Sequence, residues 1–461
     1  MIDRRLPLAE LHLHLYGTIR ADDYLERLGA RAADIDWGYY EKTYERAYGD
    51  RPPVRAILQR HLAGDPDAAS AFRDLFVFGD ADAGNFQRFQ AKFNLLINGS
   101  ELTNAAVLLT KEGVHADPVP PVAEEIDFFV ARMLEDQRRQ GIGYAEQRML
   151  FGANFPIETT RRLSIPILER YAAATRDGFT ARLALGLPRA DPWPCFELVK
   201  ELALGPYGEH VTGVDFCNVE EGFPPKHKRE FFAAVHNWND RHPERALAIL
   251  YHVGESFTDK SLESAVRWVH EAADYGAHRL GHAIALGVDP EVYGAHERSE
   301  SVDERLDQIE YDLAHERGLQ KYGVSIDTNA LREERDELSA RSPAERIAHR
   351  YDETRAMEVR ARQNYAMACI ARTRAVVEVC PTSNLRIGGI ADAQHHPVHR
   401  FIDAGVPFVV ASDDPGIFDT TVRDELAWVA REAGLEEGAV EDLIERAWRS
   451  RSEVLTGRER L

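Results

Sequence analysis

The sequence predicts an α/β fold, specifically a (β/α)8 TIM-type barrel with helical insertions after its first and sixth strands. Two observations carry this prediction. Eight short runs rich in apolar, β-branched and aromatic residues recur along the 461 residues, and segments with helical periodicity lie between them. Strands that alternate with helices are typical of a parallel sheet. A count of eight favours a closed barrel over an open doubly wound sheet.

The eight expected strands are short, and each is followed by a turn or a polar motif. They cover residues 8–13, 142–148, 181–187, 210–216, 247–252, 277–282, 375–380 and 407–412. Two connecting segments show apolar residues three and four positions apart, as a helix requires. The segment 124–141 ends in Gly141 and the segment 259–276 ends in Gly276. A glycine just past a periodic segment is a helix stop.

Two long stretches exceed a minimal barrel. Residues 30–123 separate the first two expected strands, and residues 290–372 separate the sixth from the seventh. The second stretch is dense in alternating charges, which is typical of a pair of solvated helices. A lid or a contact between subunits is the alternative. Because no repeat, low-complexity linker or break in composition divides the chain, we expect one domain over 1–461 with both insertions.

Charge and composition narrow the class of partner. The formal net charge is −21, and an acidic surface repels nucleic-acid phosphates and anionic membranes. We therefore expect a small-molecule partner, and a homo-oligomer is compatible with the sequence. The four cysteines form neither a C-x-x-C pair nor a disulfide framework. Since we find no secretory signal and no apolar membrane-spanning stretch, we expect a cytoplasmic protein.

The first expected strand carries two histidines one residue apart, in LAELHLHLYG (8–17). Residues i and i+2 of a strand point to the same side, so His12 and His14 should both face the barrel interior. They stand at the carboxyl end of the strand, where barrel enzymes place their chemistry. Imidazole is a good zinc ligand. Alone, the pair is a weak signal for a metal, and pore-facing or surface histidines are the more common explanation.

Other strand ends favour a metal site. The fifth expected strand ends at His252 with Glu255 three residues on, the sixth ends at His282, and Asp413 and Asp414 follow the eighth. Carboxyl ends of barrel strands meet at one face. Three histidines and one carboxylate suit a catalytic zinc that keeps one position for water.

The motifs ELHLHLYGTIR, HVGE, RLGHAIAL, CPTSN…HHPVHRF and ASDDPGIF resemble those of the adenosine deaminase family within the amidohydrolase superfamily. They occur in the family order and span positions 9 to about 425. GYAEQR (143–148) and GVDFCNVEEGF (213–223) are similar to further strand ends of the family. The set is specific, although no single motif is.

The resemblance implies one Zn²⁺ per chain, or another divalent metal, held by four ligands: His12, His14, His252 and Asp413. It also implies a catalytic set. His282 orients the attacking water, Asp413 takes a proton from it, and Glu255 protonates the ring nitrogen beside the attacked carbon. Asp414 hydrogen-bonds the imidazole ring of a purine.

Two positions depart from adenosine-specific members of the family. Tyr16 stands where such members carry an acidic residue that contacts ribose, and Asn218 stands where they tend to carry glycine. We therefore expect Tyr16 and Asn218 to bind a substrate that differs from adenosine in part of its structure. The metal ligands are unaffected by either change.

Each motif also has a purely structural interpretation. Glu255 fits a carboxylate at a helix amino terminus, Asp414 with Pro415 fits a turn that leads into a helix, and His282 fits a buried histidine bonded to backbone. We interpret the cluster His395, His396 and His399 as structural and expect Cys380 to pack at a strand end.

The expected function is zinc-dependent hydrolytic deamination of an aminopurine nucleoside or related compound in purine metabolism, with release of ammonia. Adenosine is the leading substrate, and free adenine or a modified adenosine is the alternative. Two other classes stay open: a metal-dependent hydrolase of a cyclic amide or lactone, and a binding protein without catalysis. The complete set of motif residues argues against the last of these.

Overall fold

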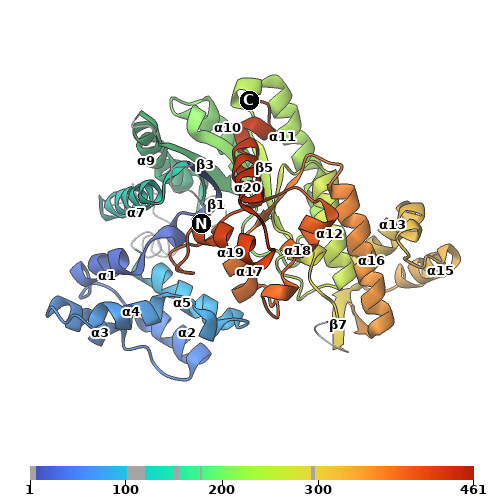
Figure 1. Ribbon diagram of the computed structural model, residues 1–461, viewed down its shortest axis with the longest axis horizontal. Coiled ribbons are helices and arrows are strands. Elements are labelled where there is room, and N and C mark those ends of the chain that lie inside the picture. The colour runs from blue at the N-terminus through green and yellow to red at the C-terminus, as the bar shows by residue number, and fades with distance from the viewer. Residues whose placement is uncertain (1–6, 101–119, 150–154, 177–178, 292–295, 461) are drawn as a thin grey trace.

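A computed structural model describes residues 7–100, 120–149, 155–176, 179–291 and 296–460 of the chain (Figure 1). Its main sheet has eight parallel strands in the order β1-β2-β3-β4-β5-β6-β9-β10. Their bounds are β1 Leu8–His14, β2 Ile142–Met149, β3 Thr180–Gly186, β4 Val211–Asp215, β5 Ala248–Val253, β6 Arg279–His282, β9 Val376–Val379 and β10 Phe408–Val410. The prediction of eight parallel strands is confirmed, and each lies within a few residues of its expected position.

The two edge strands meet, which closes the sheet into a barrel. Leu13 of β1 forms a parallel bridge with Asp413, just beyond β10. The His14 amide donates to the Asp413 carbonyl at 3.2 Å, and the Asp413 amide donates to the His12 carbonyl at 3.0 Å. The predicted (β/α)8 barrel is therefore confirmed.

Helices surround the barrel and connect its strands. They are α1 Ala21–Ala30, α7 Pro120–Arg139, α9 Ile157–Arg176, α10 Trp193–Leu204, α11 Arg229–Arg241, α12 Leu262–Asp274, α16 Glu353–Ile370, α17 Pro381–Ile387, α18 Val398–Ala404, α19 Val422–Glu432, α20 Glu437–Arg449 and α21 Ser452–Leu455. The helices expected within 124–141 and 259–276 are α7 and α12. Ser261 caps α12 by accepting the Ser264 amide at 3.1 Å, and Gly276 follows the helix with φ of 99°, which favours glycine.

The first insertion is helical, as expected. Its helices are α2 Gly38–Tyr48, α3 Val54–Leu62, α4 Ala68–Phe76 and α5 Phe86–Gly99. They lie together on one side of the barrel, at the lower left of Figure 1. Residues 101–119 of the expected insertion lie outside the described residues. The single-domain organisation over 1–461 stays a prediction.

The second insertion differs from the expected pair of solvated helices. It contains α13 Val302–Ala314, α14 Glu316–Lys321 and α15 Thr328–Leu338, and also an antiparallel pair of strands, β7 His296–Ser301 and β8 Arg346–Tyr351. The inward side chains of this pair include Glu300 and His349, which contact each other at 2.7 Å. Because a polar pair fills part of the buried face, apolar periodicity does not reveal these strands.

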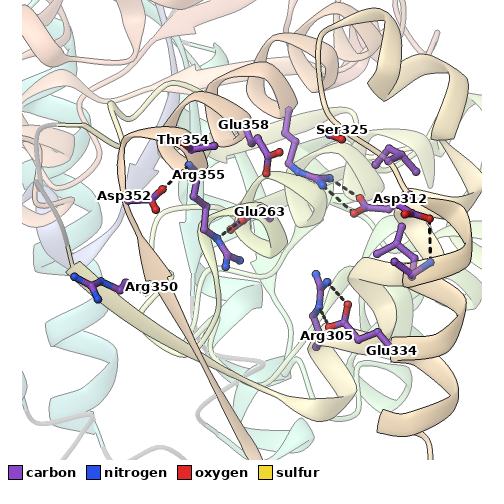
Figure 2. Close-up of a pocket in the computed structure, with 15 residues that line it drawn as sticks. Glu263, Arg305, Asp312, Ser325, Glu334, Arg350, Asp352, Thr354, Arg355 and Glu358 are labelled. Atoms are coloured by element: carbon purple, nitrogen blue, oxygen red, sulfur yellow. Dashed lines mark hydrogen bonds and ion pairs between the residues drawn. The ribbon is translucent and has the colours of Figure 1, made fainter.

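A cavity of about 560 Å³ lies within the second insertion (Figure 2). Its walls are strongly charged, but three of the four arginines that line it are paired. Arg305 contacts Glu334 at 2.7 Å and Arg355 contacts Glu263 at 2.7 Å, and Arg362 pairs with Asp312 at 2.5 Å. These pairs neutralise much of the lining from within, so we assign no ligand to this cavity.

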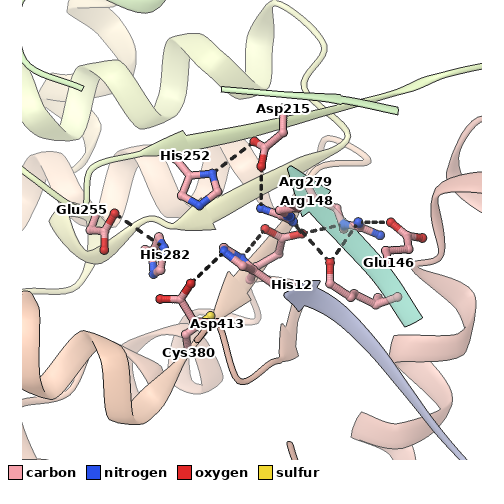
Figure 3. A network of polar contacts seen from close by, with 12 residues as sticks. His12, Glu146, Arg148, Asp215, His252, Glu255, Arg279, His282, Cys380 and Asp413 are labelled. Carbon is pink, nitrogen blue, oxygen red and sulfur yellow. Dashed lines mark hydrogen bonds and ion pairs between the residues drawn. The ribbon is translucent and has the colours of Figure 1, made fainter. Parts of the chain in front are cut away.

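The barrel interior contains a buried network of charged side chains (Figure 3). Arg279 pairs with Glu146 and contacts Glu378 at 2.7 Å, and it also donates to the Ser450 carbonyl at 2.8 Å. The hydroxyl of Ser452 donates to Glu146 at 2.7 Å. The segment between α20 and α21 is thereby joined to the charged interior.

In the parts of the chain that the structure describes, no helix combines the length and the apolar character that a membrane span requires.

Replacement of Arg279 by leucine should destabilise the fold strongly. The change leaves Glu146 and Glu378 buried without this partner, and breaking a buried ion pair costs about 3–5 kcal/mol. We expect a loss of that size in the free energy of unfolding, measured by urea denaturation. The control is Arg332→Leu on exposed α15, where we expect a change within about 0.5 kcal/mol. A loss below about 1 kcal/mol in Arg279→Leu would contradict the structural role of the network.

Candidate metal centre and active site

Five of the expected site residues meet at the carboxyl ends of four strands. His12 and His14 end β1, His252 lies one residue before the end of β5, His282 ends β6, and Asp413 follows β10. The imidazole centroids of His12 and His252 are 4.7 Å apart, and those of His12 and His282 are 4.9 Å apart. Residues that are distant in the sequence therefore form one cluster (Figure 3).

The spacing of the donor atoms suits a divalent ion. The Nε2 atom of His14 lies 3.2 Å from Asp413 Oδ1, and that of His12 lies 3.5 Å from the same oxygen. Zinc bonds of about 2.0–2.2 Å in a tetrahedron place neighbouring donor atoms about 3.4 Å apart. The potential ligand atoms of His12, His252 and His282 also lie within 4.8 Å of one another.

The electrostatics of the cluster favour a positive charge at its centre. The Nε2 atom of His12 is buried and has no hydrogen-bond partner among the described residues. Although burial opposes protonation, a hydrogen bond to Asp413 raises the pKa of His14 well above its usual value. Burial likewise opposes ionisation of Asp413, but its close contacts with His12 and His14 hold its pKa well below the usual range. The donor set therefore fits a bound cation.

Two carboxylates that the sequence analysis did not single out orient the histidines. Glu378 Oε2 lies 3.0 Å from His12 Nδ1, and Asp215 Oδ1 lies 3.1 Å from His252 Nδ1. A carboxylate at Nδ1 accepts the proton there and leaves the Nε2 lone pair free for a metal. Arg148 pairs with both carboxylates. Each acid lies near the carboxyl end of its strand, Glu378 within EVC and Asp215 within VDF. That position is the sequence signal from which these two carboxylates could have been identified.

The surroundings of Glu255 favour its protonated form. It follows β5, and its Oε2 atom lies 3.6 Å from His282 Nε2. Burial raises the pKa of Glu255 to about 8, with the Asp413 carboxylate as the next contribution. The side chain is therefore protonated at neutral pH and able to donate.

Glu220 fixes the turn that carries Glu255. Its carboxylate accepts the backbone amides of Gly254 at 2.9 Å, Glu255 at 3.2 Å and Ser256 at 3.2 Å. Gly254 has φ of 69°, and a Cβ atom there would lie 2.6 Å from Val269. The glycine is thus required by both the backbone and the packing. Glu220 is the first acid of the EE pair in GVDFCNVEEGF, so this motif supplies the residue that fixes the turn.

His282 is held by a side chain rather than by backbone. Asn384 Nδ2 lies 2.9 Å from His282 Nδ1, and the Asn384 Oδ1 atom accepts the Cys380 amide at 3.3 Å. This second bond directs the amide nitrogen of Asn384 to the imidazole, so Nδ1 accepts and Nε2 carries the proton. His282 has φ of 62°, a left-handed conformation that is typical of functional sites in non-glycine residues.

Asp414 lies against the loop that follows β1. A Cβ atom on Gly17 would lie 1.6 Å from Asp414 Oδ1, so only glycine allows this approach. Asp414 Oδ1 is buried without a partner among the described residues, and burial raises the pKa of Asp414 to about 8. Pro415 belongs to the expected turn, but the next α-helix, α19, starts only at Val422.

Tyr16 and Asn218 occupy different surroundings. The Tyr16 hydroxyl donates to Glu125 on α7 at 3.1 Å, and its ring packs on Phe129. Asn218 lies in the loop after β4, where its carbonyl accepts Arg189 Nε at 3.1 Å. The side-chain Oδ1 atom of Asn218 is buried without a partner among the described residues. Asn218 therefore offers a free acceptor.

The residues expected to be structural have structural contacts. Cys380 is buried at the end of β9. His396 Nδ1 accepts the Val398 amide at 3.1 Å, and His399 Nε2 lies 2.9 Å from the Ala393 carbonyl. His395 pairs with Asp392 at 2.7 Å. This histidine cluster is therefore not part of the candidate metal centre.

Comparison with known proteins finds similarity to deaminases. The family model described as adenosine deaminase matches residues 336–454. An aminodeoxyfutalosine deaminase of Streptomyces coelicolor is 42% identical over 77 residues, 17% of this chain and 20% of that protein. The chain thus matches about a fifth of the length of this relative. An adenosine deaminase of Shewanella denitrificans is 21% identical over 448 residues, 96% of this chain and 93% of that protein.

Solved structures share the fold. The adenine deaminase of Arthrobacter aurescens superposes with a TM-score of 0.52 at 16% identity, covering 98% of this chain and 97% of that one. An amidohydrolase of Burkholderia ambifaria with bound zinc superposes with a TM-score of 0.51 at 15% identity, covering 97% and 86%.

Replacement of Asp215 by asparagine should weaken metal binding at the cluster. The change removes the carboxylate that orients His252, and loss of such a partner lowers metal affinity about 10–100-fold. Zn²⁺ titration of metal-stripped protein by calorimetry measures the effect. Asp136→Asn is the control, because Asp136 pairs with Arg20 at 2.9 Å, away from these histidines. Equal affinity in Asp215→Asn and wild type would exclude the orienting role.

Proposed function

The chain belongs to the adenosine deaminase family, and from this premise we propose that it is an enzyme that hydrolytically deaminates an adenine-type ring. One observation carries the proposal. At one end of the barrel, histidines and an aspartate with metal-like spacing adjoin Glu255, a carboxyl group that is protonated at neutral pH. A metal-ligand set beside a proton donor suits hydrolytic attack at an sp² carbon.

The proposed cofactor is one divalent ion, Zn²⁺ by preference, with His12, His14, His252 and Asp413 as its ligands. When bound, such an ion supplies Lewis acidity that lowers the pKa of a water molecule toward neutrality. The free Nε2 of His12 and the orienting carboxylates at His12 and His252 support this assignment. Zinc in a structure of the same fold is consistent with it.

The chain's own side chains carry the proton transfers. Glu255 donates a proton to the ring nitrogen next to the carbon that bears the amine. Asp413 accepts a proton from the attacking water. His282 presents its Nε2–H toward the same region, where it can hold that water and stabilise the developing charge. The proton held by Asp413 passes to the amine of the tetrahedral adduct, which leaves as ammonia, while the hydroxyl of the adduct returns a proton to Glu255 and becomes the carbonyl.

The base-binding residues are proposed from their free polar atoms. Asp414 Oδ1 is buried and unpartnered among the described residues, so it is suited to a hydrogen bond with the five-membered ring of a purine. Asn218 Oδ1 offers a second acceptor for the substrate. We propose that Tyr16, fixed by Glu125, lines the space beyond the base. These side chains would therefore select the group attached to the adenine ring.

An ammonia-release screen tests the function and the substrate together. The compounds are adenine, adenosine, adenine nucleosides with altered 5′ groups such as aminodeoxyfutalosine, and a cyclic amide and a lactone as comparison. We expect ammonia from at least one adenine compound and no ring opening of the amide or lactone. Hydrolysis of the amide or lactone without ammonia release from any adenine compound would overturn the proposal.

The acid role of Glu255 is tested by Glu255→Gln on the best substrate of that screen. Glutamine cannot donate the proton, and general acid catalysis is worth about 10²–10⁴-fold. We expect kcat to fall by about 1000-fold while zinc content is retained, measured by coupled ammonia assay and metal analysis. Exposed Glu230→Gln on α11 is the control. Turnover near wild type in Glu255→Gln would remove Glu255 from the mechanism.

A further inference from the structure

A second group of metal-ligating side chains lies outside the barrel, where the second insertion meets α12. His270 and Asp274 are one helical turn apart on α12, and His315 directly follows α13. One potential ligand atom from each residue lies within 4.8 Å of the other two. The Nε2 atom of His270 is 3.4 Å from Asp274 Oδ2, the separation of about 3.4 Å that neighbouring donors have around tetrahedral zinc.

Two tyrosines orient the imidazoles of this group. His270 Nδ1 lies 2.6 Å from the Tyr311 hydroxyl, and His315 Nδ1 lies 2.8 Å from the Tyr365 hydroxyl. When each Nδ1–H donates to its tyrosine oxygen, both Nε2 atoms keep a free lone pair, and that of His270 lies beside the Asp274 carboxylate. Three acceptors then converge, and a cation between them satisfies all three.

We propose that His270, Asp274 and His315 bind a divalent transition-metal ion of the zinc class, at a site separate from the barrel centre. Two nitrogens and one carboxylate oxygen are a ligand set that zinc accepts. The ion joins the carboxyl end of α12, which belongs to the barrel, to the carboxyl end of α13, which belongs to the insertion. It acts as a clamp that holds the insertion on the barrel.

The surroundings allow an ion to enter. The His270 side chain is 2% exposed, but that of Asp274 is 45% exposed, so the carboxylate can move to meet the ion. A surface cavity of about 280 Å³ opens beside the group and is lined in part by His315 and Tyr365. Water from this cavity can complete the coordination. The net charge of −21 favours the approach of cations.

The test measures bound zinc per chain after the full-length protein is loaded with Zn²⁺ and freed of excess by gel filtration. The variants are Asp274→Asn and His315→Gln, and exposed Asp240→Asn, also near the end of its helix α11, is the matched control. His12→Ala removes a proposed ligand of the barrel centre. Circular dichroism of the metal-free proteins verifies that each variant is folded.

We expect Asp274→Asn and His315→Gln each to lose one equivalent of zinc that wild type, Asp240→Asn and His12→Ala all retain. Zn²⁺ should raise the Tm of wild type by more than that of Asp274→Asn. Equal zinc content in wild type and both variants overturns the site. Since His12→Ala reports on the barrel centre separately, failure of the proposed deaminase function leaves this result readable.

Tyr311→Phe tests the orientation of His270. Loss of such a hydrogen-bonding partner lowers metal affinity about 10–100-fold, so we expect the dissociation constant of this equivalent to rise about tenfold in a Co²⁺ titration followed by visible absorption. Turnover on the best substrate should be unchanged. An unchanged dissociation constant contradicts the tautomer on which the proposed geometry rests.

Discussion

The site depends on how the barrel interior balances its buried charges. Three carboxylates, those of Glu146, Asp215 and Glu378, share two guanidiniums, those of Arg148 and Arg279. Buried ions are stable only with good geometry and satisfied hydrogen bonds, so this network has little freedom to move. The other carboxylate oxygen of Glu378 accepts from Nδ1 of His12, and the other carboxylate oxygen of Asp215 accepts from Nδ1 of His252. The orientation of both imidazoles is therefore a consequence of charge pairing deeper in the barrel.

The strained backbone conformations of the site lie at the carboxyl ends of the strands, next to this network. His282 and Asp413 both have positive φ values, which non-glycine residues adopt at a cost of about 1–3 kcal/mol each. Closely fitted loops hold the neighbouring acids, Glu255 and Asp414. Glu220 binds three successive amides of the turn that carries Glu255, and Gly17 leaves room for Asp414. The loops thus hold Glu255 and Asp414 near the Asp413 carboxylate, and burial together with that charge raises the pKa values of Glu255 and Asp414.

The residues that could be predicted from the sequence stand where a local pattern changes abruptly. His12, His252 and Asp413 each interrupt an apolar run at its carboxyl end. Glu378 and Asp215 could not be assigned in the same way, because a single acid in a strand does not reveal its partner. Asn384 acts through a contact with His282, 102 positions away. The strands β7 and β8 were missed because Glu300 and His349 fill positions where an apolar pattern would be expected.

The seam of the barrel has a consequence for how the protein is made. Ser412 donates to Glu10, its partner 402 positions earlier, and Asp413 bonds to the backbone of His12 and His14 on both sides of the same seam. During synthesis the first strand emerges from the ribosome long before its neighbour across the seam exists. Contacts of such long range form late and slowly. A nascent chain therefore cannot close the barrel until β10 has been synthesised, and Asp413 joins the histidines of β1 only then.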